Sequence, residues 1–208
     1  MDWLNAQARR VPTWVVYLLG LVPLCFLIWG AVFGGLGPDP VKAIERGLGE
    51  RGLQFLLASL AITPLRRVGL NLICFRRALG LLSFIYVTLH LVAWIWLDMG
   101  LRWNEMLADL TKRPFVILGM IGFVAMLPLA ATSWNGAIRR MGPAAWNRLH
   151  RLAYVAILAG VVHLALLRRS GRPRCSSIFA LASVFWRCVW CRGPECGGAR
   201  LSDGGGRC

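Results

Sequence analysis

Long apolar runs separated by short charged connections decide what this chain can fold into. Four of these runs are close to the roughly 20 residues that a helix needs to cross a bilayer, and they lie at about 12–33, 78–97, 114–133 and 146–167. A fifth run has a shorter apolar core, so we expect its helix, at about 45–65, to begin upstream, with Pro38 and Pro40 near its entry. Helices satisfy their own backbone hydrogen bonds in lipid. We therefore predict an all-α, polytopic bundle of five transmembrane helices.

The composition agrees with a membrane protein. Hydrophobic residues make up 57% of the chain and the mean hydropathy is +0.59, which is too apolar for an ordinary soluble domain of this size. The net charge of +15 would also suit a nucleic-acid-binding protein. The basic residues, however, sit in short connections beside apolar runs, where they set topology and meet lipid. We therefore expect membrane lipid, and no nucleic acid, as a partner.

The distribution of charge predicts the orientation. The N-terminal segment and the second and fourth connections together hold ten arginines and one acidic residue. The first and third connections hold six basic and six acidic residues. Because cytoplasmic loops carry the excess of Lys and Arg, we expect a cytoplasmic N-terminus. Five crossings then place residue 168 on the outer side.

The composition changes abruptly after Leu167, which divides the chain into a membrane domain, 1–167, and a tail, 168–208. The tail is rich in Arg, Gly and Cys, and its arginines would lie on the outer side, against the rule that set the topology. Its apolar stretch, 176–191, is short and contains Arg187, so it makes a poor sixth helix. One hypothesis is that the tail is translated out of the original reading frame.

The chain has three histidines, and two of them are predicted to lie at one depth. His90 follows Arg77 by 13 residues and His163 follows Arg151 by 12, which puts them roughly 20 and 18 Å into the membrane at 1.5 Å per residue. An imidazole at such depth needs a partner. Two neutral imidazoles on separate helices can be the axial ligands of a haem iron. Zinc is less favoured because it takes four ligands, often thiolates, and no cysteine lies at that depth; an ordinary hydrogen bond between helices remains the alternative.

The third histidine, His150, is predicted to lie at the cytoplasmic surface. Thirteen residues turn an ideal helix through about 220°, so it does not share a face with His163. It is either a ligand of a second haem, a contact for an anionic cofactor, or an ordinary interfacial residue. The arginines expected beside it would suit haem propionates or a flavin phosphate, although contact with lipid phosphate would also explain them; they are Arg76, Arg77, Arg148 and Arg151.

Three stretches of the sequence resemble a known family. They are RRALGLLSFIYVTLH (76–90), TSW (132–134) and WNRLHRLAYVAILAGVVH (146–163), and they are similar to MsrQ, also called YedZ, within the ferric-reductase-like transmembrane group. The resemblance covers about 10–167. It implies six helices in the bacterial inner membrane, b-type haem on His90 and His163, His150 as the family's third histidine, and FMN as a further cofactor. The tail of this chain departs from the family's sixth helix.

The resemblance also implies a function. Members of the family take electrons from quinol or a cytoplasmic flavin reductase and pass them to MsrP, a periplasmic molybdenum-dependent enzyme that reduces methionine sulfoxide in oxidised proteins. The chain would then be an electron-transfer subunit of an oxidoreductase. It has no glycine-rich dinucleotide fingerprint after a strand, which agrees with a separate electron donor.

Three other functions remain open on sequence alone. A self-sufficient ferric reductase would need an attached flavin and nicotinamide domain. A transporter that relays protons through its histidines would need acidic residues beside them inside the membrane, and we expect all nine acids in connections or in the terminal segments. A purely structural anchor would leave two histidines at one depth without a role.

Overall fold

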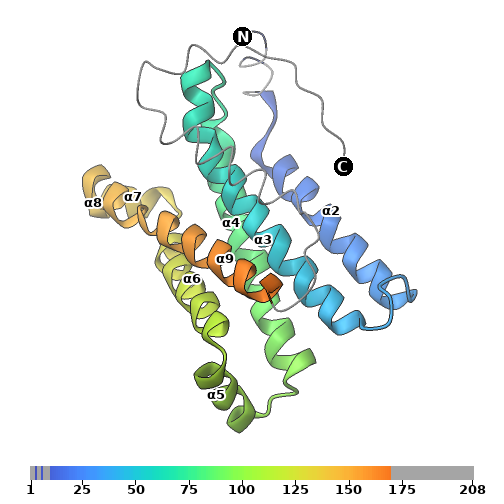
Figure 1. Ribbon diagram of the computed structural model, residues 1–208. Helices are drawn as coiled ribbons and strands as arrows, with labels where there is room; N and C mark the ends of the chain where they lie inside the picture. Colours follow the sequence, from blue (N-terminus) through green and yellow to red (C-terminus); the bar gives the residue numbers. More distant parts are fainter. Residues whose placement is uncertain (1–2, 4–5, 7–9, 170–208) are drawn as a thin grey trace, which may run out of the picture.

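The computed structural model describes residues 3, 6 and 10–169, and this part of the chain is helical with no strand, which confirms the all-α prediction. The predicted tail from residue 170 onward, with its possible helix at 176–191, lies outside the described residues. Figure 1 shows the arrangement of the longer helices, which are α2 (Thr13–Val32), α3 (Pro40–Leu65), α4 (Ile73–Ala93), α5 (Trp103–Lys112), α6 (Pro114–Ala131), α7 (Asn135–Met141), α8 (Pro143–Leu149) and α9 (Leu152–Arg169).

Four helical segments in the described part are long and apolar enough to cross a membrane. They are α2, α6, the stretch Ile73–Asp98 that extends α4, and the stretch Pro143–Leu167 that joins α8 to α9. The chain is therefore a multi-pass membrane protein. The first half of α3 carries charged residues, which explains why this helix falls outside the set; they are Lys42, Glu45, Arg46, Glu50 and Arg51.

Helix α3 begins at Pro40, upstream of the expected start at about residue 45. Proline fits the first turn of a helix because the N–H that it lacks would have no partner there. The 26 residues of α3 correspond to a length of about 39 Å, which exceeds the thickness of the hydrocarbon core. The helix is thus long enough to reach from one end of the bundle to the other.

The last apolar run forms two helices where the sequence predicted one, at about 146–167. Helix α8 ends at Leu149, a turn follows at His150 and Arg151, and α9 begins at Leu152. In this region the indole N–H of Trp146 donates a hydrogen bond to the carbonyl oxygen of Thr132, 3.1 Å away. The predicted rotation of about 220° between the two histidines assumed an unbroken helix and does not apply across this turn.

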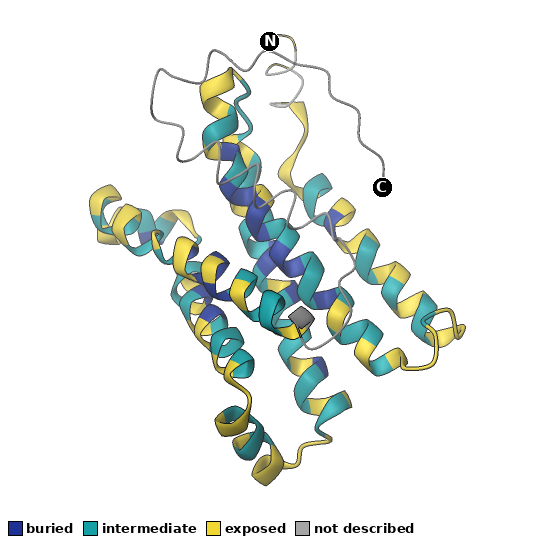
Figure 2. Ribbon diagram, viewed as in Figure 1, coloured by how far each residue is buried: buried dark blue, intermediate teal, exposed yellow. Residues whose placement is uncertain are grey.

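The core lies around α3, which packs along α4 and also contacts α2 and α9. Helices α6 and α9 form a second closely packed pair. Figure 2 shows buried positions gathered where these helices meet, while α2 is mostly exposed. The main cluster joins α3, α6 and α9, and its buried members are Leu53, Leu56, Leu57, Leu60, Met126, Ala153, Ala156 and Ile157.

Buried hydroxyl groups tie α4 to its neighbours. The phenol of Tyr86, fully buried, donates to the carbonyl oxygen of Gly20 in α2 at 2.7 Å. Ser83, on the same helix, donates to the carbonyl oxygen of Gly52 in α3, also at 2.7 Å. Each bond satisfies a buried polar group and fixes the height of one helix against the next.

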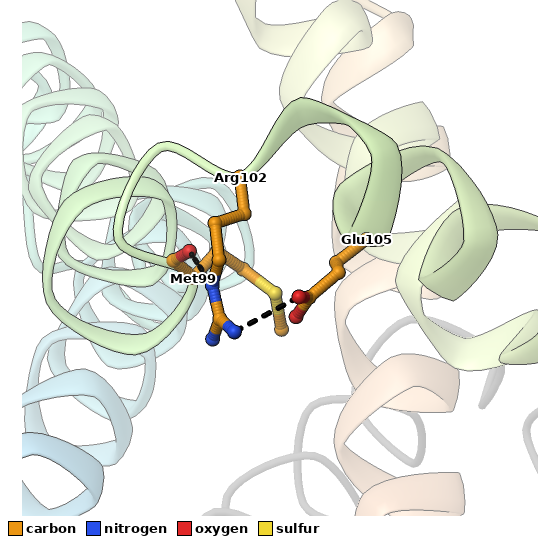
Figure 3. A network of polar contacts seen from close by, with 3 residues as sticks. All are labelled: Met99, Arg102 and Glu105. Carbon is orange, nitrogen blue, oxygen red and sulfur yellow. Dashed lines mark hydrogen bonds and ion pairs between the residues drawn. The ribbon is translucent and has the colours of Figure 1, made fainter.

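A sharp turn after α4 leads into α5. Five residues of π-helix, Trp94–Asp98, end the α4 segment, and Gly100 and Leu101 follow with positive φ angles of 56° and 61°. Arg102 closes the turn: its Nε donates to the carbonyl oxygen of Met99 at 3.1 Å and its Nη1 to Oε1 of Glu105 at 2.9 Å (Figure 3). In Figure 1 this turn and the connection between α2 and α3 lie toward the lower end of the view, opposite the connection between α3 and α4.

Candidate functional site

Two of the three histidines meet inside the bundle. His90 lies near the end of α4 and His163 in the second half of α9, and their ring centroids are 6.4 Å apart. The two ring planes are nearly perpendicular, at 78°. With metal–nitrogen bonds of about 2 Å, two imidazoles that bind one iron from opposite sides have centroids roughly 6 to 6.5 Å apart. The observed separation therefore matches that of an axial pair.

The first ring is fixed by the backbone of α3. Nδ1 of His90 lies 2.8 Å from the carbonyl oxygen of Glu45. A carbonyl oxygen only accepts hydrogen bonds, so Nδ1 carries the proton and donates it. This tautomer leaves the lone pair of Nε2 free to bind a metal.

The second ring is fixed in the same way by α6. Nδ1 of His163 donates to the carbonyl oxygen of Phe115, 2.6 Å away, and the Phe115 ring lies beside the imidazole with the centroids 6.1 Å apart. Nε2 of His163 is again the free nitrogen. Each imidazole is thus held by a neighbouring helix rather than by the other imidazole.

The donor set suits haem better than a metal held by protein alone. Within residues 3, 6 and 10–169 no group of three or more His, Cys, Asp or Glu residues is placed to hold a metal ion, whereas structural zinc takes four ligands. A haem iron needs only axial ligands from the protein, because the porphyrin supplies the other four. His90 and His163, each with a free Nε2, therefore fit a haem.

Glycines lie directly beneath both rings, and sequence reasoning missed them. A Cβ atom added at Gly49 would lie 3.2 Å from Nδ1 of His90, and one added at Gly119 would lie 3.1 Å from Nδ1 of His163. Both distances are shorter than ordinary van der Waals contact. The only signal in the sequence was a small residue within each helix, and nothing there showed which ring it would face.

His150 lies apart from this pair, at the C-terminal end of α8. Its ring stacks on the indole of Trp146, with centroids 3.7 Å apart and planes inclined by 24°. Its Nδ1 lies 3.1 Å from the carbonyl oxygen of the same Trp146 and donates to it, which leaves Nε2 free. His150 could therefore ligate or hydrogen-bond a second group, but it takes no part in the first site.

The structure shows a contact for two of the four predicted arginines. Arg76 lies close enough to His150 to interact with it electrostatically. Arg77 donates from Nη1 to Oδ1 of Asn135, 3.1 Å away, and so links the start of α4 to the start of α7. Arg148 is exposed near the end of α8, and Arg151 is exposed in the turn that follows. The structure thus brings one arginine to His150 and engages another elsewhere.

Comparison with known proteins identifies the family. Residues 49–161, which include His90 and His150 and end two residues before His163, match the family described as "Ferric reductase like transmembrane component". The protein-methionine-sulfoxide reductase heme-binding subunit MsrQ of Caulobacter vibrioides is 44% identical over 180 residues, which cover 85% of each chain.

Proteins with the same name occur in Agrobacterium fabrum, 44% identical over 76% of this chain and 73% of that protein, and in Brucella anthropi, 40% identical over 85% and 81%. The chain belongs to the MsrQ family. The alignment with the Caulobacter MsrQ spans most of both chains. No solved structure matches the chain significantly.

The geometry of the pair predicts that a missing imidazole can be replaced from solution. His163→Gly removes one ring and leaves a gap of its size beside α6. We expect this variant to lose the low-spin spectrum of a haem with two axial imidazoles, and added free imidazole to restore it. Visible absorption during an imidazole titration of the haem-supplemented variant measures this.

The matched control is His150→Gly, which should bind haem between His90 and His163 without added imidazole. An imidazole titration that leaves the spectrum of His163→Gly unchanged, with the variant folded, would contradict the assignment of His163.

Proposed function

We propose that this chain binds a b-type haem between His90 and His163 and carries electrons across the bacterial inner membrane to a periplasmic methionine sulfoxide reductase. The observation that carries the proposal is the pair of imidazoles, 6.4 Å apart, on two helices that meet inside the bundle. The names of the MsrQ relatives support both the haem and the reaction that it serves.

The residues of the chain act by orienting and enclosing the cofactor. The carbonyl oxygens of Glu45 and Phe115 set the tautomer of each histidine, so that the Nε2 of each ring is left to bind a metal. Such hydrogen bonds also make the imidazoles more basic ligands. A haem held there supplies one-electron chemistry through its iron.

The proposed orientation has the N-terminus and the connection between α3 and α4 in the cytoplasm, because Arg66, Arg67, Arg76 and Arg77 surround that connection. Helix α3 then acts as the fifth crossing. Its charged first half is compatible with this role because its buried face packs inside the bundle. The haem histidines, near the far end of α4 and in the second half of α9, would lie closer to the periplasm.

We propose that the cytoplasmic end holds the point of electron entry. His150 with Arg76 would contact an anionic group, either the phosphate of FMN or the propionates of a second haem, since guanidinium groups bind planar and tetrahedral anions well. Arg77, Arg148 and Arg151 would contribute positive potential there. The donor would be quinol or a cytoplasmic flavin reductase.

The partner would be a molybdenum-dependent enzyme of the MsrP type. Reduction of one sulfoxide takes two electrons and two protons and yields a thioether and water. Each haem carries one electron at a time, so the chain would deliver them to the partner in two steps. The sulfoxide chemistry would occur on the partner.

The proposal predicts electron transfer that depends on the sulfoxide. The full chain, loaded with haem and reduced anaerobically, should be reoxidised when both an MsrP-type partner and a methionine sulfoxide peptide are added. Stopped-flow absorption of the haem measures the rate. The same partner with a methionine peptide is the control and should oxidise no more than a stoichiometric amount.

A haem that stays reduced with partner and sulfoxide, yet is oxidised rapidly by ferric chelates, would contradict this acceptor. It would favour a ferric reductase, the activity in the name of the wider family.

The proposed orientation predicts the labelling of Cys74, an exposed thiol at the start of α4. In a variant in which the other six cysteines are replaced by serine, a membrane-impermeant maleimide should label Cys74 in inside-out vesicles but not in intact spheroplasts. Gel shift after labelling measures this.

The control moves the single cysteine to exposed Asn104 on α5, which lies beyond the other end of α4. Asn104→Cys should show the reverse pattern. Labelling of Cys74 in intact spheroplasts would overturn the orientation.

A further inference from the structure

The two candidate haem ligands rest on the same backbone arrangement in two different helices. His90 donates to the carbonyl oxygen of Glu45 and lies against Gly49, four residues later. His163 donates to the carbonyl oxygen of Phe115 and lies against Gly119, again four residues later. Helix α3 provides the first arrangement and α6 the second.

The spacing of four residues has a physical reason. A carbonyl group in an α-helix points along the axis toward residue i+4, so the side chain at i+4 covers the path by which an outside donor would approach. Glycine leaves this path open and allows close approach of another group to the backbone. An imidazole can then lie over the glycine Cα while its Nδ1 reaches the carbonyl oxygen.

We propose that Gly49 and Gly119 are positioning residues, which seat the two imidazoles and thereby set the angle between their planes and the strength of their hydrogen bonds. This inference rests on the proposed function, in which these imidazoles bind the haem. We call each glycine with its carbonyl, Glu45–Gly49 and Phe115–Gly119, a ring seat.

The ring seats determine two electronic properties of the iron. First, they hold the imidazole planes at 78°, and nearly perpendicular axial planes give a low-spin ferric iron one dominant low-field EPR feature instead of a three-line rhombic spectrum. Second, the hydrogen bond to the carbonyl makes each imidazole a stronger donor to iron. A stronger donor stabilises the ferric state and lowers the reduction potential.

Simple helix packing is the competing explanation, and the same helices show what it looks like. A Cβ atom at Gly47 would lie 2.7 Å from Cδ2 of Leu27, and one at Gly52 would lie 2.7 Å from Cγ2 of Val87. These glycines admit aliphatic side chains from α2 and α4. Gly49 and Gly119 differ because the atoms they admit belong to the imidazoles themselves.

The experiment uses Gly49→Ala and Gly119→Ala in the full chain. Each new methyl group should push its ring away from the carbonyl oxygen. We expect haem affinity to fall about tenfold or more, as for other partners of metal ligands. We also expect the reduction potential to rise and the low-field EPR feature to move or split into a rhombic spectrum. Haem titration, potentiometry with optical detection and EPR measure these effects.

The controls separate positioning from packing. Gly47→Ala introduces a closer contact in the same helix as Gly49 but touches Leu27. Gly122→Ala lies one turn from Gly119, and the atoms nearest to its new Cβ belong to Ala156, Ala159 and Gly160 at 3.6 to 3.9 Å, in ordinary van der Waals contact. Both controls should keep the wild-type potential and EPR spectrum. Circular dichroism and size-exclusion chromatography in detergent establish whether each variant is folded. Because the two ring seats lie in different helices, the test can still be made with one glycine variant if the other does not fold.

The outcomes distinguish this inference from the proposed function. If the wild-type chain binds no haem, the proposed function fails. Two results would overturn the positioning role of Gly49 and Gly119 while leaving the proposed haem binding intact. In the first, the chain binds haem and both glycine variants keep the wild-type potential and EPR spectrum. In the second, Gly47→Ala shifts the potential and the spectrum as much as Gly49→Ala does.

Discussion

A hydrogen bond from an imidazole to a helix carbonyl is the interaction on which the candidate site depends. Inside a bilayer there is no water to hold an imidazole in one orientation, so the neighbouring backbone does so. The donors, His90 and His163, come from α4 and α9, and the acceptors come from α3 and α6. Each ring is therefore fixed only while its pair of helices stays in register. The close packing of α3 along α4 and of α6 along α9 holds these registers.

The sequence was enough to predict the helical class and the meeting of two histidines, for a simple geometric reason. Charged residues stay out of the hydrocarbon core and each helical residue rises by 1.5 Å. Counting from the arginine that precedes each run thus predicted one depth for His90 and His163. The structure places their ring centroids 6.4 Å apart. The turn at His150 interrupts the last run, but a short turn changes the height of His163 along the bundle little, so the two rings still meet.

The remaining features depend on neighbours that a single sequence does not reveal. The start of α3 at Pro40 is followed by charged residues that resemble a loop, and the packing of α3 along α4 is not visible in a single sequence. The turn at His150 lies close to a contact with a distant part of the chain, the hydrogen bond from the indole of Trp146 to the carbonyl oxygen of Thr132. The two ring seats use backbone carbonyls, which every residue has, so no residue type marks them. Gly49 and Gly119 become informative only once the facing imidazole is known.

The visible absorption spectrum of the detergent-purified chain, oxidised and then reduced with dithionite, shows whether His90 and His163 bind a haem. A haem bound between His90 and His163 predicts a low-spin b-type spectrum in the wild type and in His150→Ala, and its loss in His90→Ala and in His163→Ala. A wild-type chain that is folded and stays colourless after haem addition would contradict it. So would a low-spin spectrum that survives in both His90→Ala and His163→Ala, because the axial ligands would then lie elsewhere.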